Sequence, residues 1–368
     1  MDVQPKPNIV HLPVYEPGKP IEDVKRELGL KDVTKLASNE NPFGCSPKAK
    51  QAIIDEIENC SLYPDGAAVE LTNAVAKHLH VEPNQIIFGM GSDEVIMMLA
   101  RAYFVPGDET VMSTHTFSQY KHNCEVENAV VIEVPDREGK HDLDGMLAAI
   151  TEKTKIVWVC NPNNPTGTMV TKAELDAFLA KVPPHVLIAL DEAYCEYVRD
   201  ENYPNGLDYL PRYKNVVVLR TFSKIYGLAA LRIGYGVGHP DVIHTINQVR
   251  DPFNTSRFAQ SAALAAIQDQ EFIERCRQAN ADGLIYLQGE FDRLGLAYFP
   301  AYGNFIMADV KRPAKSVFEG LMKQGFIVRG GHALDFPTKI RVTIGSREQN
   351  EGFIRALEHV LDEVSVTV

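Results

Sequence analysis

The sequence contains few cysteines, and none of them is spaced as a metal or redox motif would require. Six cysteines are scattered over 368 residues, and no two form a CxxC pair, which argues against a zinc ribbon or a dithiol redox site. Such scatter is typical of reduced thiols in a cytosolic protein, so we expect a cytoplasmic location. We predict no metal site, because no cluster of His or Asp residues supports one.

Long hydrophobic runs and an excess of positive charge are also missing. No stretch approaches the ~18 uninterrupted apolar residues of a membrane span. The first residues, Met1 to Pro7, lack the apolar core of a signal peptide. The net charge of −12 argues against general binding to nucleic acids or anionic membranes. An anionic ligand would therefore have to be held by locally placed arginines.

The length and the distribution of apolar runs predict an α/β protein with two domains. From about residue 85, short apolar runs alternate with helical patterns, which predicts a mostly parallel seven-stranded sheet with helices on both faces. The runs cover 85–88, 109–112, 129–134, 155–159, 186–190, 215–219 and 232–235.

The two ends of the chain have different patterns. Five prolines among the first 20 residues predict an extended arm, followed by a short amphipathic helix over 21–28. After about residue 251, a long helical stretch over 259–294 leads to two strand-like runs, 304–309 and 339–344. We expect an N-terminal arm with its helix (1–40), packed on the small domain and a partner subunit, a large domain (41–255) and a small α+β domain (256–368).

A lysine follows one of the apolar runs. Lys224 comes shortly after Val216–Leu219, among small and hydroxyl residues, and Arg232 lies eight positions further on. A lysine held where a buried strand ends can be desolvated, which lowers its pKa and frees the amine to form a Schiff base with an aldehyde. The hydroxyls and the arginine suit an anionic group such as a phosphate. Since most lysines are solvated surface charges, this interpretation depends on the rest of the chain.

A glycine turn precedes the first helical pattern after residue 85. The segment Gly89–Glu94 resembles the start of a dinucleotide fingerprint, but Glu94 stands where the third glycine should be, which disfavours a dinucleotide. A glycine turn at a helix N-terminus still presents N–H groups and a positive dipole end to a phosphate. The alternative is a plain helix cap by Ser92 or Asp93.

Two further polar residues follow apolar runs. Asn164 lies in the proline- and asparagine-rich loop Asn161–Gly167. This loop could be merely a turn, yet the Asn164 amide could donate to an aromatic oxygen or a carboxylate. Asp191 ends the run Val186–Leu190, where an unpaired carboxylate is costly. It could pair with the protonated ring nitrogen of an electron-sink cofactor or bind a metal. Ligands of open α/β sheets bind beyond the carboxyl ends of the strands, so we expect these residues to meet there.

Taken together, these residues resemble the fold-type I pyridoxal-phosphate (PLP) enzymes of the aspartate aminotransferase superfamily. The motifs occur in the expected order over nearly the whole chain: Gly-Ser-Asp-Glu, Phe117-Ser-Gln-Tyr120, Asn-Pro-Thr-Gly, Asp-Glu-Ala-Tyr, Ser-Lys and Arg232. Within the superfamily the chain resembles the histidinol-phosphate aminotransferases. The markers are Tyr15–Pro20, Leu36–Pro42, Tyr63–Asp65, Asn304-Phe305 and Lys339–Glu348.

The resemblance implies a role for each matching residue. Lys224 would bind PLP covalently and later move the α-proton of the substrate, and Asp191 would pair with the pyridine nitrogen. Asn164 and Tyr194 would hydrogen-bond the phenolic oxygen of the cofactor. Phe117 would stack on the ring, where many relatives carry Tyr. The cofactor phosphate would be held by Ser92, Asp93, Thr221, Ser223 and Arg232, together with Tyr63 from the partner subunit of a homodimer.

The resemblance also implies contacts to the substrates. These residues would be Tyr15, Asn41, Asn164, Arg329 and Arg341, with the two arginines gripping a phosphate or carboxylate. Alternatively, the arginines are surface charges at strand ends, and the Asn41–Gly44 segment is merely a turn.

The implied reaction is amino transfer between L-histidinol phosphate and 2-oxoglutarate, giving imidazole-acetol phosphate and L-glutamate in histidine biosynthesis. An aromatic amino-acid aminotransferase would share every catalytic residue and differ only in the substrate pocket. A PLP-dependent phospho-amino-acid decarboxylase would carry similar motifs. A regulator built on the same fold is disfavoured by the acidic charge and the lack of an appended DNA-binding segment.

Overall fold

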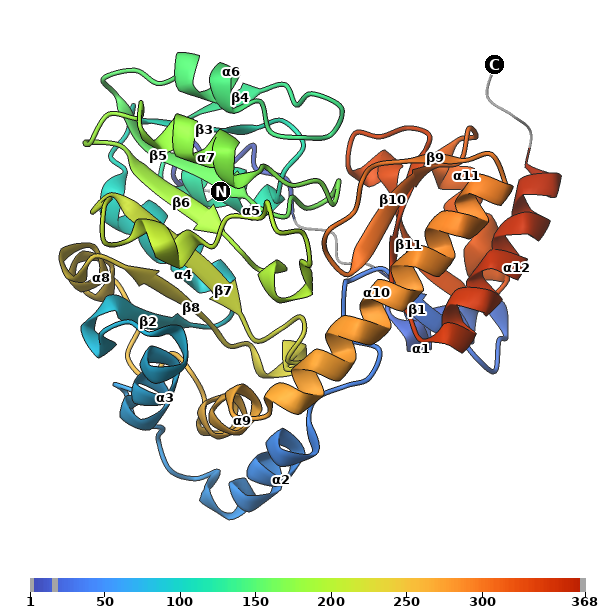
Figure 1. The fold of residues 1–368 in the computed structure, drawn as a ribbon, viewed down its shortest axis with the longest axis horizontal. Coiled ribbons are helices and arrows are strands. Elements are labelled where there is room, and N and C mark those ends of the chain that lie inside the picture. The colour runs from blue at the N-terminus through green and yellow to red at the C-terminus, as the bar shows by residue number, and fades with distance from the viewer. Residues whose placement is uncertain (1–2, 15–18, 365–368) are drawn as a thin grey trace.

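Two separate β-sheets organise the chain in the computed structural model, which describes residues 3–14 and 19–364 (Figure 1). The strand order of the seven-stranded sheet is β2-β8-β7-β6-β5-β3-β4, and that of the five-stranded sheet is β1-β11-β12-β10-β9. Each sheet has hydrophobic cores of its own. Among the described residues, no helix is long and apolar enough to cross a lipid bilayer.

All seven strands predicted for the large sheet are present. They are β2 (Ile86–Gly89), β3 (Glu109–Ser113), β4 (Val130–Val134), β5 (Thr154–Cys160), β6 (Leu187–Asp191), β7 (Val216–Thr221) and β8 (Gly234–Gly238). The sheet is mostly parallel, as predicted, but β8 runs antiparallel to both of its neighbours, β2 and β7. The carboxyl ends of β5, β6 and β7 therefore lie side by side at one edge.

Helices cover both faces of the large sheet. Alternate residues of each strand point to opposite sides, and in the central strands both sets are apolar. On β5, Ile156 and Trp158 belong to one core, whereas Val157 and Val159 belong to the other. The first core is covered by α4 (Ser92–Tyr103), α5 (Ser118–Val126) and α8 (Pro240–Asn247). The second is covered by α2 (Pro47–Asp55), α3 (Val69–Leu79), α6 (Leu143–Ala148), α7 (Lys172–Leu179) and α9 (Arg257–Ile267).

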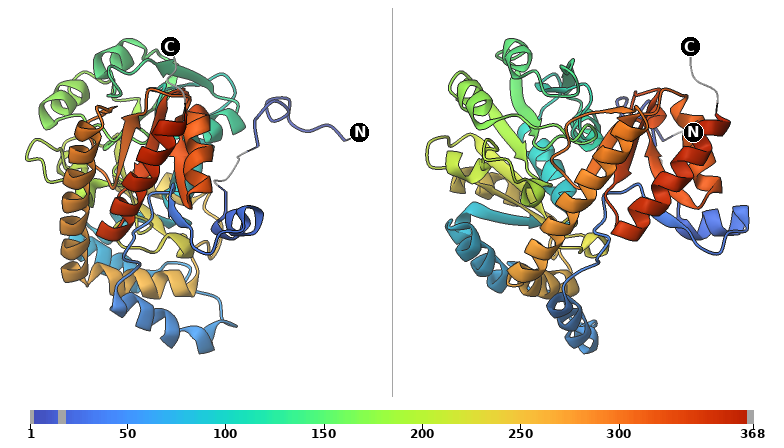
Figure 2. Two further views of the ribbon diagram at one scale, coloured as in Figure 1. Left: turned by 90° about the vertical axis from the view of Figure 1, so that its right-hand side faces the viewer. Right: turned by 45° about the vertical axis from the view of Figure 1, so that its right-hand side comes forward.

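The small sheet contains more strands than the two predicted from the sequence. It consists of β1 (Thr34–Leu36), β9 (Ala297–Tyr298), β10 (Phe305–Asp309), β11 (Phe326–Gly330) and β12 (Lys339–Thr343). Its helices are α1 (Ile21–Leu28), which matches the predicted helix, α11 (Ala314–Lys323) and α12 (Arg347–Glu363). Because β1 pairs in parallel with β11, the N-terminal segment joins the C-terminal sheet, as Figures 1 and 2 show.

Short 3-10 helices lie in the connections of both parts. They cover Ile57–Asn59, Pro83–Gln85, Cys195–Tyr197, Gly206–Tyr209, Ala229–Leu231 and Gly331–Ala333.

The long helix α10 (Gln270–Arg293) connects the two parts of the molecule (Figure 2). Phe272 near its start packs in a core of the large sheet, whereas Leu287 and Phe291 near its end pack in the core of the small sheet. The helical stretch predicted over 259–294 is thus interrupted at Gln268–Asp269 and forms α9 and α10. Since α9 packs with the large sheet, the packing favours a domain boundary within α10 over one at residue 256.

Candidate functional site

A pocket lies beyond the carboxyl ends of β5, β6 and β7, and it gathers almost every residue predicted to bind a cofactor. Its lining consists of Gly91, Ser92, Asp93, Phe117, Cys160, Asn164, Asp191, Ala193, Tyr194, Thr221, Ser223, Lys224 and Arg232. Of the predicted cofactor contacts, Tyr63 is the exception. The pocket forms where it was expected because each contributing loop directly follows a buried strand.

Lys224 is a half-buried amine that lines this pocket. Its Nζ donates to the backbone carbonyl of Ser38 over 3.4 Å and lies 5.4 Å from the centre of the Tyr194 ring. Burial, helped by the positive charge of Arg341, lowers the pKa of Lys224 to about 8. The neutral amine is therefore far more abundant near neutral pH than on a solvated lysine, and it can attack an aldehyde or accept a proton.

Asp191 ends β6 and is buried, with only 2% of its surface exposed. The hydroxyl of Tyr120 donates to its Oδ2 over 2.6 Å, and the backbone N–H of Ala193 donates to its Oδ1 over 3.1 Å. Burial raises the pKa of Asp191 to about 6, although both hydrogen bonds oppose this shift. A cationic ring nitrogen placed opposite the carboxylate would replace part of the solvation that Asp191 has lost.

Tyr120 was not predicted as a site residue. It lies three positions after Phe117, and the two rings meet edge to face at 5.6 Å. Tyr120 stacks on Trp158, with 4.9 Å between the ring centres, and the Trp158 indole N–H donates to the Thr110 hydroxyl over 2.9 Å. This buried series of contacts fixes the hydroxyl that binds Asp191. The sequence signal for it was the Phe-x-x-Tyr spacing of the family motif, in which Phe117 directly precedes α5 and Tyr120 lies in its first turn.

The N-terminus of α4 forms an anion-binding end of the pocket. Gly91, directly before α4, has φ 75°, and a Cβ there would lie 2.6 Å from Nη2 of Arg232. Arg232 donates to the Asp93 carboxylate over 3.0 Å and to the Ser223 hydroxyl over 3.4 Å. The helix dipole, the guanidinium and the hydroxyls together suit a phosphate. Because a carboxylate repels a phosphate, Asp93 could contribute only its backbone N–H.

Two amides converge on the hydroxyl of Tyr194. Nδ2 of Asn39 donates to it over 3.0 Å, and Nδ2 of Asn164 donates over 3.3 Å. Oδ1 of Asn164 in turn accepts a hydrogen bond from Arg341, whose Nη2 also donates to the carbonyl of Ala37 over 2.7 Å. Burial raises the pKa of Tyr194, so its hydroxyl stays protonated near neutral pH. Sequence reasoning identified Asn39 only as part of a family marker.

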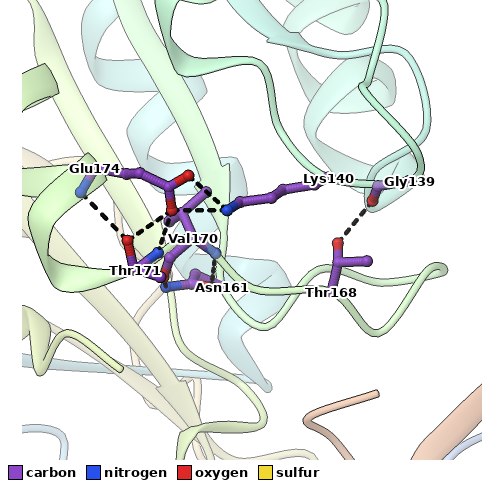
Figure 3. A network of polar contacts seen from close by, with 7 residues as sticks. All are labelled: Gly139, Lys140, Asn161, Thr168, Val170, Thr171 and Glu174. Carbon is purple, nitrogen blue, oxygen red and sulfur yellow. Dashed lines mark hydrogen bonds and ion pairs between the residues drawn. The ribbon is translucent and has the colours of Figure 1, made fainter. Parts of the chain in front are cut away.

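Further polar contacts hold the loop that carries Asn164 (Figure 3). Asn161 and Val170 exchange two hydrogen bonds, of 3.1 and 3.0 Å, across the loop. The Thr168 hydroxyl donates to the carbonyl of Gly139 over 2.7 Å. These contacts hold the loop that carries Asn164 against the neighbouring segments.

The two arginines predicted to bind the substrate are neighbours in the small sheet. Arg329 on β11 and Arg341 on β12 are directly opposite in register, so their side chains lie on the same face. Arg341 is 7% exposed and its guanidinium lies 5.3 Å from the centre of the Phe305 ring, whereas Arg329 is half-buried. Like charges in this arrangement repel each other, and an anion between them would relieve the repulsion.

Three other predicted residues lie apart from the pocket or outside the described chain. Tyr15 falls outside the described residues. The Asn41 amide donates to the carbonyl of Ile225 over 2.7 Å, so it holds the loop next to Lys224, and its contact with a substrate stays a prediction. Tyr63 is 77% exposed and stacks on Phe253 at 4.7 Å.

Proteins of similar sequence identify the family of the chain. The family model for aminotransferase class I and II matches residues 31–357. The chain is 53% identical over 359 residues to the histidinol-phosphate aminotransferase of Brevibacillus brevis, covering 98% of this chain and 99% of that protein. It is 50% identical over 357 residues to that of Bacillus subtilis, covering 97% and 99%.

A solved structure agrees with these sequence matches. The histidinol-phosphate aminotransferase from Sinorhizobium meliloti, in complex with pyridoxal-5'-phosphate, superposes with a TM-score of 0.89 at 29% identity. The match covers 97% of each chain.

Proposed function

We propose that the chain, which belongs to the class I and II aminotransferases and within them to the histidinol-phosphate aminotransferases, transfers an amino group between L-histidinol phosphate and 2-oxoglutarate. The products are imidazole-acetol phosphate and L-glutamate, so the reaction belongs to histidine biosynthesis. One observation carries the proposal: Lys224 and Asp191 share a pocket with the anion-binding end of α4. The full-length identity to named aminotransferases supports the choice of substrate.

The lining of the pocket fits pyridoxal phosphate by its donor chemistry. When bound, this cofactor supplies an aldehyde and an electron-withdrawing ring. A Cβ at Gly91 would crowd Arg232, so the glycine lets the Arg232 guanidinium approach the N-terminus of α4, where it would meet the phosphate of the cofactor. The residues that would hold it are Lys224 at the aldehyde, Asp191 at the ring nitrogen, Asn164 and Tyr194 at the phenolic oxygen, Phe117 at the ring face, and Ser92, Asp93, Thr221, Ser223 and Arg232 at the phosphate.

Each side chain has a distinct task in the reaction. Lys224, with its lowered pKa, would hold the cofactor aldehyde as a neutral amine and would accept and return the proton at the reacting carbon of the substrate. The buried carboxylate of Asp191 would keep the ring nitrogen of the cofactor protonated. Arg341 and Arg329 bind the anionic groups of the two substrates.

We infer that the active unit is a homodimer. Tyr63 lies in a surface hollow together with other exposed apolar side chains, among them Leu62 (59% exposed), Met90 (45%) and Phe253 (46%). Exposed apolar groups that cluster in this way favour a protein contact. In a two-fold symmetric dimer, Tyr63 would reach the phosphate end of the partner's pocket. A cytoplasmic location belongs to the same proposal.

The proposal is tested by cofactor uptake and a substrate comparison. The protein should bind added PLP with visible absorbance that hydride reduction bleaches. Lys224→Ala should lose that absorbance and nearly all turnover, whereas Lys48→Ala, at an exposed lysine, should not. With 2-oxoglutarate as acceptor, kcat/KM should be higher for histidinol phosphate than for phenylalanine. The reverse preference would indicate an aromatic aminotransferase, and CO2 release from a phospho-amino acid would indicate a decarboxylase.

A further inference from the structure

Asn39 connects the small sheet to the pocket, because both its backbone and its side-chain amide form hydrogen bonds. It is 1% exposed and follows β1 in the chain. Its backbone N–H donates to the Thr343 hydroxyl over 2.9 Å, and its carbonyl accepts from the Asn304 amide over 3.0 Å. Thr343 ends β12 and Asn304 directly precedes β10. Asn39 is therefore held by the small sheet, while its side-chain amide reaches Tyr194 of the large domain.

The hydrogen bonds fix which end of the Asn39 amide faces Tyr194. The Thr343 hydroxyl accepts from the Asn39 backbone N–H and gives its own proton to Oδ1 of Asn39 over 3.1 Å, which places Nδ2 3.0 Å from the Tyr194 oxygen. The amide of Asn164 is oriented in the same way, because its Oδ1 accepts from Arg341. Two N–H donors thus point at one phenol oxygen.

This arrangement decides where the proton of Tyr194 can go. With both lone pairs of the phenol oxygen used as acceptors, neither amide can accept the Tyr194 proton, because both present N–H groups. The O–H bond must point in a third direction. Tyr194 lines the pocket, so a ligand oxygen there is the acceptor that this geometry favours.

The backbone at Asn39 restricts which residues can take this position. Its φ of 56° lies in the left-handed region, which Asn and Asp adopt more readily than other residues with a side chain. Asp is thus the substitution that keeps the backbone and the side-chain shape. It differs from Asn in the one property that matters here, since a carboxylate accepts hydrogen bonds and donates none.

We propose that Asn39 is a positioning residue that directs the Tyr194 hydroxyl proton into the pocket, toward the phenolic oxygen of bound pyridoxal phosphate. The small sheet holds Asn39, so Asn39 restricts the direction of the Tyr194 O–H bond only while the small sheet keeps it in contact with Tyr194. This inference rests on the proposed function, because the cofactor supplies the acceptor.

The decisive variant is Asn39→Asp, read through the spectrum of the bound cofactor and not through turnover. The carboxylate at position 39 would accept a hydrogen bond from the Tyr194 hydroxyl. The O–H bond would then turn away from the pocket. The ionised cofactor oxygen then loses a donor, so the pH midpoint of its visible absorbance change should rise by about one unit, a tenfold shift in the equilibrium. An unchanged midpoint would overturn the proposal.

A second background separates the hydrogen bond from the new negative charge, which also raises the midpoint. In Tyr194→Phe the hydroxyl is absent, so Asn39→Asp can act there only through its charge. The shift caused by Asn39→Asp should be at least halved in the Tyr194→Phe background. Equal shifts in both backgrounds would show that Asn39 does not act through Tyr194.

Thr343→Val provides a variant in case Asn39→Asp does not fold. It removes the hydroxyl that orients the Asn39 amide but adds no charge. It should also raise the pH midpoint, by less than Asn39→Asp does. A midpoint equal to that of the unmodified protein would overturn the orientation argument. Failure of the unmodified protein to take up PLP would instead contradict the proposed function, so the two failures are distinguishable.

Discussion

The hydroxyl of Tyr120 lies 2.6 Å from Oδ2 of Asp191, with both side chains almost completely buried. A buried carboxylate is costly unless it is hydrogen-bonded, and Tyr120 supplies one of the two hydrogen bonds that the Asp191 carboxylate receives among the described residues. Burial raises the pKa of Asp191, whereas the Tyr120 bond lowers it. Tyr120 therefore helps to keep Asp191 ionised and able to face a protonated ring.

Tyr120→Phe should weaken PLP binding without disturbing the stack on Trp158. The hydrogen bond to the carboxylate is lost, so the pKa of Asp191 should rise further above about 6. Affinity for PLP should fall by roughly tenfold at pH 6.5 and by less at pH 8, where Asp191 is ionised again. Titrations at both pH values measure this, with Tyr209→Phe, at another buried tyrosine, as control. A loss that is equal at the two pH values would contradict the explanation.

Asp191→Asn should lower kcat strongly and change how the stability of the cofactor-free protein depends on pH. The pKa of Asp191 is about 6 in the folded protein, against the ordinary 3.8. Between these values the folded state binds more protons than the unfolded state. The contribution of Asp191 to the free energy of unfolding therefore falls as pH rises from about 4 to 6, by on the order of 3 kcal/mol. Urea unfolding at pH 5 and 7.5 should show a smaller fall in the Asn variant; an identical fall would refute this.

The rate of PLP uptake should follow the protonation of Lys224. Burial lowers its pKa to about 8, and only the neutral amine attacks an aldehyde. The second-order rate constant should therefore rise roughly tenfold per pH unit below pH 8 and level off above it. Stopped-flow absorbance between pH 6 and 10 measures the profile. A rate constant that kept rising to pH 10 would mean that Lys224 behaves as a solvated lysine.

Arg329→Ala should reduce kcat/KM for histidinol phosphate by roughly ten- to a hundred-fold, because one charge-assisted hydrogen bond to an anion is lost. The loss should be smaller for phenylalanine, since a phosphate dianion gains more from a second arginine than a single carboxylate does. Arg347→Ala, at an exposed arginine of α12, serves as control and should leave both values unchanged. Equal losses on the two substrates would remove Arg329 from phosphate recognition.

Mixing two inactive variants should restore activity if Tyr63 serves the partner's pocket. In the Tyr63→Ala homodimer both sites are impaired. In the Lys224→Ala homodimer both sites are inactive. A mixed dimer has one site with an intact Lys224 and an intact Tyr63 from the other chain. After equilibration of equal amounts, random pairing should yield about a quarter of the unmodified activity. No recovery, despite subunit exchange shown by native mass spectrometry, would contradict a shared site.

The large sheet and its pocket were predictable because their signals are local. Each central strand is a short apolar run, and the run is followed at once by the polar motif that lines the pocket. Asp191 after β6 and Lys224 after β7 show this pattern. The parallel arrangement then brings the ends of the strands together without any further information from the sequence.

The missed features depend on contacts between distant parts of the chain. The three residues of β1 are too few to show a period, and they form a strand because β11 lies beside them. Tyr120 meets Asp191 across 71 positions and Asn39 meets Tyr194 across 155. No local pattern encodes such pairs. The interruption between α9 and α10 was missed because Gln268 and Asp269 do not break a helix by their identity alone.

Helix α10 fixes the distance and the relative rotation of the two cores that it connects. Its first turns are anchored among the side chains of one core and its last turns among those of the other. Inserting a single residue between Cys276 and Leu287 would advance the distal half by about 1.5 Å and rotate it by about 100°. Leu287 and Phe291 would then face away from the hydrophobic pocket that receives them now. We therefore expect this segment to reject insertions and deletions.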